Sequence, residues 1–207
     1  MKILRVLMLT FVFIMTMALP AMAQGNQSNS PAQKISFNDA VFFGGTENTD
    51  TFVGLSSYSE VQNQYNLYLE KYNFETGDYY FGSAAIPASE VVFNTTKGIV
   101  TVNKTVDVYK VEYTYDEETD SETVTETYVG AESVNLTWTF NPRNYSTHKF
   151  IEKNIELDFD EYLQLSKGTF KDYKGVQITG NIGDTDIKVL DYTGGGVSTG
   201  TALSIIK

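Results

Sequence analysis

The chain has no cysteine, a single histidine and only one tryptophan among its 207 residues. Without cysteine it cannot form a disulfide framework, a cysteine zinc site, a thiol nucleophile or a covalent haem attachment. The single histidine, His148, excludes a metal site in which one chain supplies two or more imidazoles. Basic residues are also scarce, with 15 Lys and Arg against 26 Asp and Glu, a net charge of −11. This balance predicts no partnership with nucleic acid or anionic lipid, because phosphate binding depends on clustered lysine and arginine.

The first 23 residues have the pattern of a secretory signal peptide. Lys2 and Arg5 form a positively charged start, an apolar stretch follows, and Ala21 and Ala23 supply the small residues of a cleavage site. The apolar stretch is shorter than the roughly 20 residues that a membrane-spanning helix needs. The pattern predicts a secreted or periplasmic protein with no transmembrane segment after signal cleavage. An exported chain without cysteine is typical of a prokaryotic protein large enough to be stable without disulfide bonds.

The remaining chain divides into a short polar segment and one domain. Residues 24–34 are polar and show no apolar periodicity, which predicts a flexible N-terminal segment. From Ile35 to the C-terminus, short runs with a period near two alternate with turn residues, as in antiparallel sheets. Residues 35–207 are therefore predicted to form a single all-β domain. No window carries the apolar spacing of a full-length helix.

Two local features of this pattern are specific enough to test. The runs 65–74 and 79–86 flank a turn at Gly77 and predict a β-hairpin. In the long run 99–115 the apolar residues change from even to odd positions, which predicts a β-bulge near residues 108–110. The run of three glycines at 194–196 is interpreted as a turn or hinge between two strands.

About a dozen strands need either two packed sheets or a closed barrel to protect their edges. We expect an antiparallel β-sandwich of the jelly-roll type, with a closed β-barrel as the alternative.

Tyrosines are concentrated in the predicted hairpin, and three of them, Tyr68, Tyr72 and Tyr80, are candidate ligand-binding residues. Aromatic faces stack on sugar rings, while nearby amides and carboxylates can hydrogen-bond to hydroxyl groups. The alternative is that these tyrosines only cover a sheet, with each ring packed and each hydroxyl in water. Trp138 lies in an alternating apolar run and is predicted to be in the core.

An acidic hairpin tip supplies the candidate metal ligands Asp116, Glu118 and Asp120. Crowded carboxylates suit Ca²⁺, which takes about six to eight oxygen ligands, but the glycine and glutamate of an EF-hand loop are missing here. The alternative is a solvated hairpin end whose charges oppose edge-to-edge aggregation. Calcium is the one cofactor that the sequence suggests.

No catalytic residue can be nominated from the sequence. The Gly-x-Ser-x-Gly pattern at 196–200 lacks the following helix, acid and histidine of a nucleophile elbow. The acids are numerous, but none forms a recognisable pair for glycoside hydrolysis. Whether the protein is an enzyme stays open, with the balance toward a non-catalytic role.

The stretch 68–87, together with 134–139 and the following loop that contains His148, resembles exported bacterial β-rich proteins of no assigned function. That resemblance implies export and β structure, and it supplies no activity, ligand or catalytic residue. The leading hypothesis is an exported non-catalytic binding module for carbohydrate or cell-surface material. A lipocalin-like carrier of a small ligand and a secreted hydrolase are the alternatives.

Overall fold

A computed structural model describes residues 33–58, 63–116, 121–158 and 161–206 of the chain. Most of this part is extended, and it contains two three-residue 3₁₀ helices, η1 (Ala88–Glu90) and η2 (Ile187–Val189). No helix in the described ranges has the length and apolarity to cross a membrane. The strands are β1 (Gln33–Gly45), β2 (Thr49–Tyr58), β3 (Gln64–Asn73), β4 (Tyr79–Pro87), β5 (Val92–Asn94), β6 (Ile99–Asp116), β7 (Ser121–Thr139), β8 (Tyr145–Asp158), β9 (Glu161–Tyr173), β10 (Gln177–Ile182), β11 (Thr185–Asp186) and β12 (Tyr192–Ile206).

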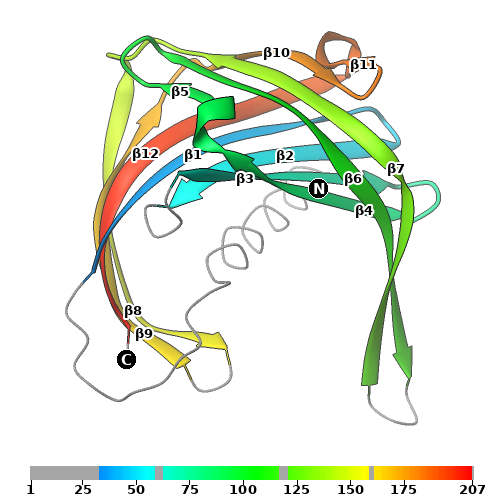
Figure 1. Ribbon diagram of the computed structural model, residues 1–207, viewed down its shortest axis with the longest axis horizontal. Helices are drawn as coiled ribbons and strands as arrows, with labels where there is room; N and C mark the ends of the chain where they lie inside the picture. Colours follow the sequence, from blue (N-terminus) through cyan, green and yellow to red (C-terminus); the bar gives the residue numbers. More distant parts are fainter. Residues whose placement is uncertain (1–32, 59–62, 117–120, 159–160, 207) are drawn as a thin grey trace.

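All twelve strands belong to one antiparallel sheet, which confirms the all-β prediction. Its order is β11-β10-β7-β6-β4-β3-β2-β1-β12-β9-β8, and β5 pairs with β6 beside this path. Among the described strands, β11 and β8 are open edges, so the closed-barrel alternative is wrong. The strands also do not separate into the two sheets of a jelly-roll-like sandwich, because neighbouring strands remain paired from one edge to the other. Figure 1 shows the sheet bent into an arch, with β8 and β9 as one leg and the far half of the β6–β7 hairpin as the other.

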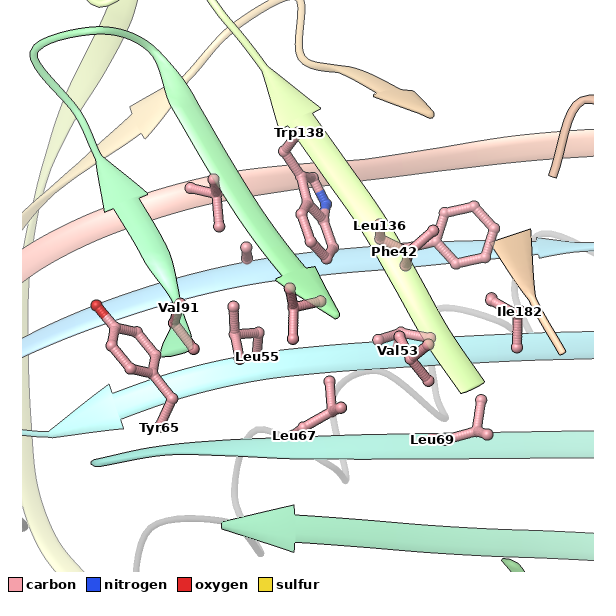
Figure 2. Close-up of a cluster of buried hydrophobic side chains, with 14 of the residues drawn as sticks. Phe42, Val53, Leu55, Tyr65, Leu67, Leu69, Val91, Leu136, Trp138 and Ile182 are labelled. Atoms are coloured by element: carbon pink, nitrogen blue, oxygen red, sulfur yellow. The ribbon is translucent and has the colours of Figure 1, made fainter. Parts of the chain in front are cut away.

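The hydrophobic core lies where the sheet folds over itself. The Trp138 indole on β7 donates a hydrogen bond of 2.8 Å to the carbonyl oxygen of Val41 on β1, although β7 and β1 are not neighbours in the sheet. Trp138, predicted to be in the core, is completely buried. Figure 2 shows it above Phe42, Leu55 and other side chains of β1, β2 and β3. Burial of these side chains holds the two parts of the sheet together.

Both specific local predictions are confirmed. β3 and β4 form the predicted hairpin, with Tyr65 opposite Ile86 and Tyr72 opposite Tyr79. The β6–β7 register shifts between Val108 and Tyr109, at the predicted bulge. The extra residue is Val129 on β7, because Val108 pairs with Gly130 and the next residue, Tyr109, pairs with Tyr128. Alternation along β6 therefore continues past this point, with its valines at even positions on the core side and its tyrosines at odd positions on the other side.

The interpretation of the three glycines as a turn is wrong. Gly194 to Gly196 lie inside the strand β12, where they pair with Phe43, Phe42 and Val41 of β1. A Cβ atom added at Gly194 would collide with the ring of Phe43, and one added at Gly200 would collide with the ring of Phe37. Glycine is needed at Gly194 and Gly200 because aromatic rings from β1 lie against the backbone there, whereas Gly196 has open space around it.

Two glycines in turns allow the energetic cost of backbone strain to be measured separately from the cost of a collision with packed neighbours. Gly98 has φ +67° and a Cβ there would collide with the carbonyl oxygen of Phe140, whereas Gly77 has φ +73° and open space around it. We expect Gly77→Ala to lower the free energy of unfolding by about 1 kcal/mol, from strain alone. Gly98→Ala should cost about 2 kcal/mol or more, because the backbone must also move. Urea unfolding measures both values, and equal losses would contradict a role for close packing at Gly98.

Candidate ligand-binding face

One side of the central strands is turned away from the core. On β1, Ala40 and Phe42 are fully buried in the core, so the alternating residues Phe37, Asp39 and Phe43 project from the opposite side. This opposite side lines the inside of the arch (Figure 1). We call it the inner face.

An aromatic row crosses the inner face. Phe43 on β1, Phe52 on β2, Glu70 on β3, Phe81 on β4 and Tyr109 on β6 lie directly opposite one another in successive strands. Residues paired in this way share a face of the sheet and lie about 5 Å apart. The row therefore presents four rings around one carboxylate.

Tyr68 extends the aromatic surface to a second row. Its ring centroid lies 6.4 Å from that of Phe81, with the two planes tilted by 35°. Phe52, Tyr68 and Phe81 are all half-buried, so part of each ring remains accessible.

Glu70 is the polar centre of this surface. Its exposed fraction is 6%, and it is the one charged side chain among the buried residues of the described part. Burial raises the pKa of Glu70 to about 7, and a hydrogen bond from the Tyr79 hydroxyl partly opposes that shift. Its Oε1 atom has no hydrogen-bond partner among the described residues. An unsatisfied carboxylate oxygen in this setting favours any ligand that can donate a hydrogen bond to it.

A second polar group lies on the same face, at the β1–β2 pair. Asp39 is directly opposite Ser56, and burial raises the pKa of Asp39 to about 7. The Ser56 Oγ and the Glu70 Oε1 are the buried side-chain oxygens without a partner in the described part of the chain. Both belong to the inner face, so the unsatisfied polar groups collect where the aromatic rings do.

The two carboxylates are too far apart to act as a glycosidase pair. Asp39 and Glu70 are separated by two strands across the sheet and four residues along it. At strand and residue spacings of about 4.8 and 3.3 Å, this places their Cα atoms roughly 16 Å apart. Glycoside hydrolysis needs carboxyl groups about 5–9.5 Å apart.

The structure divides the three candidate tyrosines between two faces. Tyr68 and Tyr72 lie on the inner face, where Tyr72 is near the strand end and packs edge-on against Phe74, with centroids 5.0 Å apart. Tyr80 alternates onto the opposite side of β4, pairs with Lys71 and lies 3.4 Å from the Asp78 Oδ2. Tyr68 and Tyr80 cannot contact one face of a ligand together.

Tyr80 instead lines a cavity of about 230 Å³ at one end of the core. The Lys71 ammonium lies in its wall and forms an ion pair with Glu132, which neutralises it. Four threonines contribute to the wall, namely Thr46, Thr49, Thr51 and Thr185. This cavity is smaller than the roughly 300–1,000 Å³ of typical small-molecule sites.

The candidate calcium site falls outside the described residues. β6 ends at Asp116, whose side chain is not described, and Glu118 and Asp120 are not among the described residues. Within the described ranges, no group of three or more His, Asp or Glu side chains is placed to hold a metal ion. Calcium binding by the hairpin tip therefore stays a prediction.

Comparison of the chain with family models, curated proteins and solved structures gives no match in any of the three.

Sequence reasoning missed the phenylalanines of the inner face and its two acids, Asp39 and Glu70. The signal was present in residues 37–43, where phenylalanine, aspartate and valine alternate with core residues. Alternation alone does not tell which of two apolar sides is the core, and both sides of this strand carry aromatic residues.

Proposed function

We propose that the protein is an exported, non-catalytic binding module that holds a glycan or other cell-surface carbohydrate on its inner face. The observation that carries this proposal is the aromatic row with the unpartnered Glu70 oxygen at its centre. Export rests on the signal-peptide pattern of residues 1–23. We also propose that the two parts of the sheet on either side of the core pack face to face, as the two layers of a β-sandwich do.

The spacing of the row suits a chain of sugar rings. Adjacent strands are about 4.8 Å apart, so rings on successive strands can form a continuous platform for more than one pyranose. Sugar C–H groups pack on the aromatic faces, and hydroxyl groups donate hydrogen bonds to the carboxylates. An arch open at two edges can admit an extended polymer, which favours this function over a carrier that encloses a small ligand.

The first test is a glycan array followed by calorimetric titration of the best ligand. Tyr68→Ala and Phe81→Ala should each weaken binding by about tenfold, because each removes one stacking platform. Tyr80→Ala is the matched control, since it removes the same ring from the opposite side of β4 and should leave affinity unchanged.

Failure of the unaltered protein to bind any glycan would contradict the proposed function. Equal losses in Tyr68→Ala and Tyr80→Ala would contradict the assignment of the inner face. Circular dichroism spectra of the three variants show whether each keeps the fold.

A further inference from the structure

A second surface, on the other side of the sheet, carries the opposite charge. Lys34 on β1, Lys149 on β8 and Lys167 on β9 line one shallow groove of about 380 Å³. All three side chains are exposed. We call this surface the basic groove.

The strand register brings the three lysines together from distant parts of the sequence. Lys167 lies opposite Ile151 of β8 and opposite Leu203 of β12, and Leu203 lies opposite Lys34. Lys149 is opposite Thr169 on β9, two residues from the Lys167 position. At ordinary sheet spacings, the three positions fall within roughly 10 Å of their nearest lysine neighbour.

Among the described residues that line the basic groove, none is acidic, so the lining does not balance these charges. Four other lysines of the described part, Lys71, Lys104, Lys110 and Lys174, form ion pairs with carboxylates. Like charges on neighbouring strands are destabilising, and this chain has 26 acids available for pairing. Three lysines in one groove, without a carboxylate in its described lining, therefore indicate a surface that is completed by an anionic partner.

The groove is also apolar. Ile151 has an exposed fraction of 67%, and it lies in the same row as Lys167 and Leu203. Leu203 lines the groove as well. Lysines beside exposed aliphatic side chains suit the boundary between lipid headgroups and acyl chains, whereas a soluble polyanion would leave the aliphatic groups in water.

We propose that the basic groove docks the protein on an anionic lipid surface, with headgroup phosphates at Lys34, Lys149 and Lys167 and with Ile151 against the acyl boundary. β8 and β9 form an outer leg of the arch in Figure 1, and the basic groove lies on the side of the leg opposite the inner face. Docking through this groove leaves the inner face free. This proposal is independent of the carbohydrate proposal. It predicts that a local group of lysines binds an anionic surface although the net charge of the whole chain is negative.

The test is co-sedimentation of the purified chain with vesicles of phosphatidylglycerol and phosphatidylcholine, compared with vesicles of phosphatidylcholine alone. Binding should need the anionic lipid and should fall steeply as salt rises from about 50 to about 300 mM. The triple variant Lys34→Gln, Lys149→Gln, Lys167→Gln should bind about a hundredfold more weakly. The matched control Lys97→Gln, Arg143→Gln, Lys188→Gln has the same change in net charge, lies outside the groove and should bind normally.

Three outcomes would overturn the proposal. One is no binding to anionic vesicles at low salt. Another is equal weakening of vesicle binding by both triple variants, which would show that the net charge, and not the basic groove, determines binding. The third is capture by a soluble polyphosphate without vesicle binding, which would assign the groove to a soluble polyanion. Ile151→Ser separates lipid from polyanion further, because it should weaken only vesicle binding. Circular dichroism controls for folding in every variant.

Discussion

Replacing Trp138 with alanine is expected to lower the free energy of unfolding by about 3–5 kcal/mol, the range for removing a large aromatic side chain from a core. The side chain is completely buried between the two parts of the folded sheet. Its indole also donates to the Val41 carbonyl across the core. Loss of both contacts removes packing that no strand pairing replaces, since β7 and β1 are not adjacent in the sheet.

Urea unfolding followed by far-ultraviolet circular dichroism measures this loss, because the variant lacks the sole tryptophan needed for fluorescence. Trp138→Phe keeps most of the ring and removes the hydrogen bond, so it should cost only about 1–2 kcal/mol. A loss below about 1 kcal/mol in Trp138→Ala would show that the two parts of the sheet are not held together by this core.

Replacing Glu70 with glutamine should stabilise the protein at alkaline pH. Burial raises the pKa of Glu70 from 4.5 to about 7, so the folded state holds this proton more tightly than the unfolded state. Stability from this group is therefore full below about pH 4.5 and is lost as pH rises toward 7. Glutamine carries no charge and can still accept the hydrogen bond from Tyr79. At about pH 8 we expect a gain of up to ~3 kcal/mol in the free energy of unfolding.

The difference in the free energy of unfolding between Glu70→Gln and the unaltered protein should grow between about pH 4.5 and 7 and then remain constant. Burial also raises the pKa of Asp39 to about 7. Asp39 therefore changes the free energy of unfolding with pH by a similar amount in both proteins and does not affect their difference. Glu126→Gln, an exposed change on β7, is the control and should show no such growth. A pH-independent difference for Glu70→Gln would mean that the Glu70 carboxylate is not desolvated in the folded protein.

The sequence predicted those features that depend on neighbouring residues. The β3–β4 hairpin follows from two alternating runs around Gly77, and the bulge at Val108 follows from a change of phase within one strand. Trp138 was predicted to be in the core because its neighbours alternate in one phase. Such signals depend only on nearby residues, so they can be interpreted without knowledge of the rest of the fold.

The same local reasoning failed where the partner strand decides the outcome. Three glycines in a row are typical of a turn, yet β12 remains extended because these glycines pair with Phe43, Phe42 and Val41 of β1. The candidate ligand-binding tyrosines were grouped by sequence, and the pleat then placed Tyr68 and Tyr80 on opposite faces. Successive side chains along a strand point to opposite faces of the sheet, so residues that are close in the sequence can lie on different faces.

By itself, the sequence determined that this chain builds antiparallel β structure, where one hairpin and one bulge lie, and that cysteine chemistry is excluded. Only the tertiary structure decided that a single open sheet folds over Trp138, that aromatic rings and Glu70 share one face, and that three lysines meet on another. The physical reason is that strand order and register join residues more than a hundred positions apart. Alternation within one strand carries no information about which strand lies beside it.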